Sequence, residues 1–214
     1  QLVRHLLAAL PDLPRLRMSS VDPAEPDHDL MEMLKCEERL MPHLHLSIQH
    51  GDDLILKRMK RRHLARDVIR FCDEARRRRP DIVFGADMIA GFPTETMAAH
   101  EASLDLIKRA GITFLHVFPF SPREGTPAAL MPQLDGGLIR ERAAALRDCG
   151  RARQSVFFAN AVGSRDQMLV ETGNMGHGRN YSRMQLSGDC VAAGSLVDVT
   201  VKESQNDLLV VQRC

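Results

Sequence analysis

The sequence predicts an α/β domain of parallel strands, followed by a small all-β domain. Short apolar runs alternate with longer helical patterns up to about residue 130. A helical stretch rich in Ala, Arg and Leu follows, and beyond about residue 156 the chain consists of short strand-like runs separated by glycines. With 214 residues, the chain is long enough for one or two domains that each bury a core.

The first part contains four predicted strands, at residues 15–20, 43–49, 82–89 and 112–118. Helical patterns lie between them at 29–39, 54–61, 65–79 and 95–110, and Gly111 is suited to end the last helix. Because helices of this length serve as crossover connections, the strands are expected to be parallel. The pattern fits the later part of a β/α barrel or an open α/β sheet, and it does not separate the two.

A long helical pattern at about residues 137–159 follows the α/β part, and the texture of the sequence changes after it. Short apolar runs then occur at 168–171, 184–186, 196–201 and 208–211, with glycines between them. Short strands with regular turn signals are typical of a small all-β barrel or sandwich. We therefore expect two domains, at residues 1–155 and 156–214.

The composition is that of a soluble globular protein, with 44% apolar and 27% charged residues. The net charge of +1 selects no partner. No apolar run approaches the ~18 residues of a membrane span, and no signal peptide begins the chain, so we expect a cytoplasmic protein without membrane contact. The five cysteines form no CxxC or CxxxC pattern, so no local thiolate cluster is predicted for zinc or an iron–sulfur centre.

Polar side chains stand where the predicted strands end. Ser19 and Ser20 close the first strand, Gln49 closes the second, and Asp87 lies in the third. Ligands of parallel α/β folds bind beyond the carboxyl ends of the strands, so these residues predict one shared pocket. Asp87 sits among apolar residues, where a carboxylate must be hydrogen-bonded or paired. Its partner is either the sugar hydroxyls of a ligand or an internal arginine or backbone group.

Two loops complete the predicted pocket. Residues 91–93 lead from the third strand into its helix, and this pattern suits a binding loop or a simple helix start with Thr94 as the N-cap. The segment 118–127 is rich in Pro and Gly and holds Arg123. An arginine in this position meets either a phosphate or carboxylate of a ligand, or an acidic side chain of the protein itself.

Basic segments offer candidate contacts for a nucleic acid. Residues 57–79 contain eleven Lys or Arg and three Asp or Glu. Residues 57–62 lie near a strand end and favour binding, whereas residues 76–79 favour a solvated helix face. In the tail, basic residues surround the chain's only tyrosine, Tyr181. This patch is either a stacking platform for single-stranded RNA or an exposed hairpin loop.

Five segments, taken in order, resemble the radical S-adenosylmethionine (SAM) methylthiotransferases, and the tail resembles their RNA-binding TRAM barrel. The segments are 17–23 (RMSSVDP), 43–53 (HLHLSIQHGDD), 56–61 (LKRMKR), 87–96 (DMIAGFPTET) and 116–129 (HVFPFSPREGTPAA). The resemblance is to the branch that adds a 2-methylthio group to N6-threonylcarbamoyladenosine beside the tRNA anticodon. It implies a partial radical SAM (β/α) barrel of the later strands, followed by the TRAM barrel.

The resemblance also implies roles for individual residues. Ser20 and Gln49 would hydrogen-bond the methionyl or ribose part of SAM, and Arg61 would pair with its carboxylate. Asp87 would accept hydrogen bonds from the ribose hydroxyls. The complete set of implied SAM contacts is Ser19, Ser20, Gln49, Arg61, Asp87, Gly91, Phe92 and Pro93. The implied contacts to the tRNA base are Phe118, Phe120 and Arg123, and those to RNA in the tail are Arg179, Tyr181 and Arg183.

The cofactors implied by the resemblance are SAM and 4Fe–4S clusters, and the implied partners are tRNA and an electron donor such as flavodoxin or ferredoxin. The family's CxxxCxxC motif and its three-cysteine amino-terminal domain are absent from this chain, so no metal ligand is predicted within it. We expect both to lie upstream, and we expect this polypeptide to be catalytically silent by itself. His50 stands where the family usually has Ser.

Other targets and another class of protein fit the same residues. Within the family, the substrate is alternatively isopentenyladenosine in tRNA or an aspartate of a ribosomal protein. Outside enzymes, the chain is alternatively a non-catalytic RNA-binding fragment, in which the tail binds tRNA and the α/β part serves as a scaffold.

Overall fold

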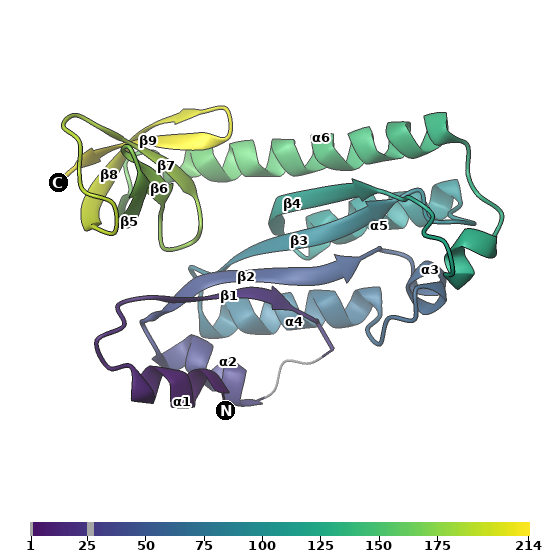
Figure 1. Ribbon diagram of the computed structural model, residues 1–214, viewed down its shortest axis with the longest axis horizontal. Coiled ribbons are helices and arrows are strands. Elements are labelled where there is room, and N and C mark those ends of the chain that lie inside the picture. Colours follow the sequence, from purple (N-terminus) through teal and green to yellow (C-terminus); the bar gives the residue numbers. More distant parts are fainter. Residues whose placement is uncertain (1, 25–27) are drawn as a thin grey trace.

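The computed structural model describes residues 2–24 and 28–214. An α/β sheet domain and a small barrel lie side by side along a long helix (Figure 1). The helices of the described ranges are all too short or too polar to cross a membrane.

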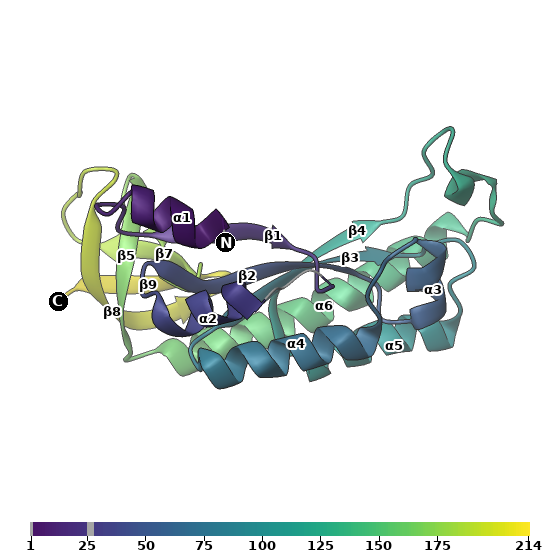
Figure 2. The same cartoon turned by 90° about the horizontal axis from the view of Figure 1, so that it is seen from below.

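Four parallel strands form the sheet in the order β1-β2-β3-β4, and their bounds are β1 Leu16–Val21, β2 Leu40–Gln49, β3 Val83–Ala90 and β4 Ile112–Pro119. All four expected strands are therefore confirmed. Because sequential parallel strands lie side by side, each connection crosses over one face, which the helices cover. β1 and β4 form the two edges, so the described part of the chain forms an open, curved sheet (Figure 2).

Helices cover one face of this sheet, and their bounds are α1 Leu2–Ala9, α2 His28–Cys36, α4 Ala65–Arg78 and α5 Met97–Arg109. The short helix α3, Asp53–Arg58, lies beyond the carboxyl ends of the strands (Figure 1). The alternation of side chains along β2 sends Leu44 and Leu46 into the helix-covered core, where both are fully buried. The intervening residues His43 and His45 therefore face the other side of the sheet. Helix α1 was not among the expected elements, because its short apolar pattern lacks any capping signal.

A short 3-10 turn at Pro127–Leu130 and the 26-residue helix α6, Gly136–Ala161, follow β4. Asp135 caps α6 by accepting hydrogen bonds from the backbone N–H groups of Gly137 and Leu138. The helix begins near the carboxyl ends of the strands and reaches the barrel at their amino ends (Figure 1). Its residue Phe158 is fully buried in the barrel core. The expected domain boundary at residue 156 thus falls inside α6.

The barrel is closed in the order β5-β6-β7-β9-β8, with β5 Arg165–Thr172, β6 Met175–His177, β7 Arg183–Ser187, β8 Leu196–Gln205 and β9 Leu208–Arg213. Its core consists of alternate residues of the strands, such as Val170, Val199 and Val211. The expected small all-β barrel is confirmed. The three-residue strand β6 was not predicted, because it contains a glycine and is too short for an alternating pattern.

Candidate functional site

A cavity of about 500 Å³ opens at the carboxyl ends of β2, β3 and β4. Five of the residues singled out in the sequence line it: Gln49, Asp87, Phe118, Phe120 and Arg123. They come from three strands and the loop after β4, so the fold brings together residues up to 74 positions apart in the chain. A cavity at the carboxyl edge of a parallel sheet is the usual ligand position in such folds.

Gln49 lies at the end of β2 with a φ of 73°, in the left-handed region that a glutamine rarely adopts. Its residue surface is only 9% exposed, and its side-chain amide has no hydrogen-bond partner in residues 2–24 and 28–214. Strained backbone of this kind is concentrated at functional sites. Gln49 therefore presents an unused donor and acceptor to the cavity.

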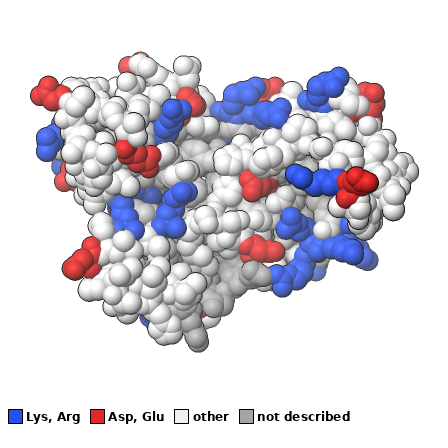
Figure 3. Space-filling model, in the orientation of Figure 1, with Lys and Arg blue, Asp and Glu red and all other residues white. Residues whose placement is uncertain are grey.

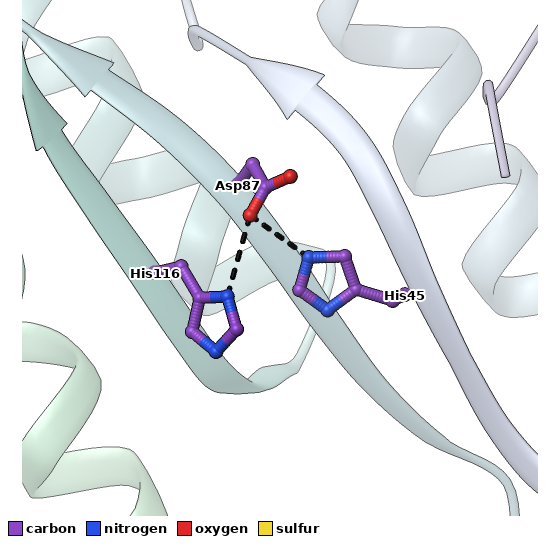
Figure 4. Close-up of side chains that lie close together, drawn as sticks. All are labelled: His45, Asp87 and His116. Atoms are coloured by element: carbon purple, nitrogen blue, oxygen red, sulfur yellow. Dashed lines mark hydrogen bonds and ion pairs between the residues drawn. The ribbon is translucent and has the colours of Figure 1, made fainter. Parts of the chain in front are cut away.

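Asp87 lies between two histidines that the sequence analysis did not single out (Figure 4). Its Oδ1 is 2.9 Å from His45 Nε2 and 3.4 Å from His116 Nδ1. Asp87 therefore has a partner within the protein, but that partner is histidine and not the arginine or backbone group that the sequence analysis considered. The sequence held a signal for His45, which lies on the same strand face as Gln49, but none for His116, which only the register of β3 and β4 places beside Asp87. The other carboxylate oxygen, Oδ2, has no partner among the described residues.

Arg123 and two aromatic rings, Phe118 and Phe120, form the wall contributed by the end of β4 and the loop after it. The guanidinium of Arg123 makes no ion pair with any described carboxylate, so the structural salt bridge considered for it is not found. Phe118 is 52% exposed, which is high for a large apolar ring. Phe120 packs edge-on against Phe92, with ring centroids 5.2 Å apart. The wall thus combines an available cation with exposed aromatic surface.

The loop 91–93 is buried and does not line the cavity. Gly91 has a φ of +77°, and a Cβ there would lie 2.6 Å from Ile139 of α6, so its lack of a side chain lets the helix approach. Phe92 and Pro93 are buried beneath the cavity wall. The prediction of Thr94 as N-cap of α5 is wrong: the cap is Thr96, whose Oγ accepts from the Ala99 N–H at 3.1 Å.

Three further candidate residues lie near the same edge of the sheet but outside the cavity lining. Ser19 and Ser20 are exposed at the end of β1, and Ser20 Oγ lies 2.8 Å from Ser47 Oγ. Arg61 follows α3, and its backbone N–H donates to the Leu56 carbonyl. The structure therefore does not bring these three side chains into contact with Gln49 and Asp87.

The candidate RNA contacts of the barrel lie at the opposite, amino-terminal end of the sheet. Tyr181 is already in contact with three side chains: the Arg17 guanidinium carbon lies 3.6 Å from its ring centroid, and the rings of His43 and His177 lie at 5.1 and 4.3 Å. Arg179 pairs with Asp166 and Arg183 pairs with Asp207. In this arrangement Tyr181 joins the barrel to β1 and β2 rather than presenting a free stacking surface.

The sequence of this α/β domain matches a known family model. Residues 3–118 match the model described as the radical SAM superfamily, which is more than half of the chain. The chain belongs to the radical SAM superfamily. The fold agrees: coproporphyrinogen III oxidase (HemN) from Escherichia coli, a radical SAM enzyme, superposes with a TM-score of 0.55 at 18% identity, covering 69% of this chain and 37% of HemN.

Curated relatives of this radical SAM chain are methylthiotransferases. The threonylcarbamoyladenosine tRNA methylthiotransferase MtaB of Rickettsia prowazekii is 47% identical over 87% of the chain and 44% of that protein. The tRNA-2-methylthio-N(6)-dimethylallyladenosine synthase of Maricaulis maris is 35% identical over 98% of the chain and 47% of that protein. The corresponding synthase of Erythrobacter litoralis is 37% identical over 95% of the chain and 47% of its own length. The chain thus spans about half the length of these relatives.

Membership of the radical SAM superfamily implies that SAM and an iron–sulfur cluster are cofactors. The side chains of the described residues suit SAM, but they do not suit an iron–sulfur cluster. A carboxylate oxygen and an amide without partners among the described residues suit the ribose and methionyl groups of SAM. In contrast, the single group of potential metal ligands found in residues 2–24 and 28–214 contains no cysteine. These residues therefore do not form an iron–sulfur site.

Basic side chains gather near the cavity on the surface of this radical SAM domain. Figure 3 shows Lys and Arg concentrated over α3 and the segment that follows it. The exposed members include Lys57, Arg58 and Lys60. The run 76–79 differs: Arg76 donates to the Ala110 carbonyl, and Arg79 donates to the carbonyls of Leu34 and Glu37. Arg76 and Arg79 therefore link neighbouring elements, whereas Arg77 is exposed, as predicted for a solvated helix face.

The radical SAM domain is expected to lose stability in acid through His43. Burial, with the nearby Arg17 charge, lowers the pKa of His43 to about 3, and neither ring nitrogen has a hydrogen-bond partner in the described structure. The unfolded chain has the higher pKa, about 6.5, so it binds more protons between these values. Stability is therefore fully present above about pH 6.5 and falls by up to ~1.4 kcal/mol per pH unit below it.

His43→Leu tests this expectation, because leucine fills the buried site without titrating. Denaturant unfolding at a series of pH values is expected to show that the variant gains stability relative to the unmodified chain as the pH falls. His28→Leu, at a side chain that is 83% exposed, is the control for a histidine-to-leucine change outside the core. A parallel pH dependence for the chain and the His43 variant would contradict the assignment.

Proposed function

We propose that this chain is part of a tRNA methylthiotransferase that adds a 2-methylthio group to N6-threonylcarbamoyladenosine. The 47% identity to the Rickettsia prowazekii enzyme, over 87% of this chain, carries the proposal. The cavity supports it, because it combines groups for an adenosyl cofactor with groups for a modified adenine. When bound, SAM would supply the radical that activates the substrate carbon.

Within the cavity, Asp87 and Gln49 would each bind a part of SAM. The free oxygen of Asp87 accepts hydrogen bonds from the ribose hydroxyls. His45 holds the carboxylate in place through a hydrogen bond to its other oxygen, and His116 lies 3.4 Å from that same oxygen. The Gln49 amide binds the ribose or methionyl group. Arg61, Ser19 and Ser20 remain proposed contacts for the methionyl end, which extends beyond the described cavity.

The substrate side of the cavity favours an anionic modified base. A threonylcarbamoyl group carries a carboxylate, whereas a dimethylallyl group is wholly apolar. Arg123 lacks an acidic partner in the described structure, so its guanidinium is available to bind a carboxylate through two parallel hydrogen bonds. Phe118 and Phe120 offer ring faces or edges to the adenine. This unpaired arginine supports threonylcarbamoyladenosine as the base.

Dimethylallyladenosine in tRNA is the second candidate substrate. It is favoured by the relatives of that name, which align with up to 98% of the chain. The exposed Phe118 ring offers apolar surface for a prenyl group. We propose in either case that the carboxyl-terminal barrel is a TRAM-like domain that contacts tRNA, and that the basic surface over α3 meets tRNA phosphates.

Nucleoside analysis of tRNA tests the function. The gene encoding this chain is deleted from its source organism, and tRNA hydrolysates are analysed by mass spectrometry. We expect loss of the 2-methylthio form of threonylcarbamoyladenosine and accumulation of its precursor. Loss of the 2-methylthio form of the prenylated base would instead establish the second candidate. If both modified nucleosides remain at their original levels, the proposed function is wrong.

A further inference from the structure

Three side chains that commonly bind transition metals converge in the middle of the sheet. His45, Asp87 and His116 come from the neighbouring strands β2, β3 and β4, and one ligand atom of each lies within 4.8 Å of the others. Figure 4 shows both imidazole rings turned toward the same carboxylate oxygen. The two ring centroids are 4.9 Å apart.

Among the described residues, only His45 and His116 form ion pairs with the Asp87 carboxylate. No described lysine or arginine forms an ion pair with the carboxylate, and its side chain is only 27% exposed. Partly buried carboxylates need a cationic or hydrogen-bonding partner. A metal ion between the three side chains would supply the positive charge and use one lone pair of each histidine.

The scaffold holds these side chains in place before any ligand binds. Asp87 and His116 are register partners on adjacent strands, so their side chains leave the same face of the sheet. Gly85 is the register partner of His45, and a Cβ at Gly85 would lie 2.7 Å from His45 Nδ1. The absence of a side chain there makes room for the imidazole. Ligands fixed by strands give a more rigid site than ligands on loops.

We propose that His45, Asp87 and His116 form a binding site for one divalent transition-metal ion of the Zn²⁺ class. Two imidazole nitrogens and one carboxylate oxygen are the donor set that suits Zn²⁺, Fe²⁺ or Ni²⁺, whereas Mg²⁺ and Ca²⁺ prefer oxygen ligands throughout. Asp87 also lines the cavity, so the ion would keep a coordination position open toward it. The site goes beyond the proposed function: the ion would bind Asp87 at Oδ1, which both imidazoles face, whereas the SAM ribose is proposed for Oδ2.

Zinc binding to the 214-residue chain tests this site. After dialysis against a chelator, the chain is titrated with Zn²⁺ in competition with a chromophoric indicator, and separately with Co²⁺, whose visible absorption reports the donor set. We expect one ion per chain. His116→Ala should weaken zinc binding at least about tenfold and abolish the Co²⁺ spectrum. Because the side chain of His116 is 61% exposed, this variant should fold normally, which a melting curve checks.

His177→Ala is the matched control. His177 also contacts a carboxylate, Glu171, at 3.0 Å, but it lies in the barrel and has no second histidine at that carboxylate. Its zinc binding should equal that of the unmodified chain, and Mg²⁺ should not compete. Absence of stoichiometric zinc binding, or equal weakening by the two histidine variants, would overturn the site. The tRNA nucleoside analysis is a separate experiment, so the site and the proposed function can fail independently.

Discussion

Replacing Arg142 with methionine (Arg142→Met) is expected to lower the free energy of unfolding by about 3–5 kcal/mol. Arg142 lies on α6 and is 5% exposed, and its guanidinium donates to the Glu95 carbonyl at 2.9 Å and lies 3.5 Å from the Glu95 carboxylate. Burial acts to raise the pKa of Glu95, but contact with His50 and the charge of Arg142 keep it below its usual range. The variant leaves this carboxylate buried without its cation.

The variant also affects the loop after β3, because Glu95 accepts a hydrogen bond from the Gly91 N–H. Chemical denaturation of Arg142→Met and of the double variant Arg142→Met/Glu95→Gln separates charge from packing. The double variant should recover much of the lost stability, since no uncompensated charge remains. Arg109→Met removes an exposed pair with Asp105 and should cost less than about 1 kcal/mol. A similarly small cost for Arg142→Met would show that the buried pair contributes little.

Asp87→Asn is expected to reduce the rate of tRNA 2-methylthiolation by about 10- to 100-fold, the equivalent of one charged hydrogen bond worth ~1.5–3 kcal/mol. The amide keeps the size of the side chain, but it removes the charge and one acceptor oxygen. This result rests on the proposed function. The gene carrying the variant is expressed in the deletion strain, and mass spectrometry follows the modified nucleoside after induction.

Asp105→Asn is the control for this measurement, since Asp105 is a carboxylate on the exposed surface of α5 with 59% of its side chain accessible. It should restore the modification at the rate of the unmodified gene. Immunoblots of both variants establish that they accumulate equally. Full restoration by Asp87→Asn would exclude the ribose contact and leave Asp87 only its histidine partners.

The layered fold was predictable because the apolar runs of β2, β3 and β4 are long and each is followed by a helical pattern. The parallel order follows from the same spacing, since crossover helices allow little else. The helical pattern at 137–159 matches α6 to within two residues at its end, but the domain boundary placed at residue 156 lies inside the helix, because residues such as Val156 and Phe158 suit a strand or a helix equally. It also misplaced the start of α5, since Thr94 and Thr96 have the same capping chemistry.

The site was predictable where the residues stand at strand ends and not where their partners are distant in sequence. Gln49 and Asp87 line one cavity because carboxyl ends of parallel strands meet at one edge. His116 was missed as a partner of Asp87, because only the β3–β4 register brings them together. The same reason applies to Tyr181, whose contacts with Arg17 and His43 depend on how the barrel packs against the sheet.

Helix α6 acts as a fixed spacer. Its 26 residues extend over about 39 Å at 1.5 Å per residue, and Phe158 is embedded in the barrel at one end while Ile139 packs beside Gly91 at the other. A single nucleoside is far shorter than this span. Any one ligand that contacts both ends of the helix must therefore be a larger molecule.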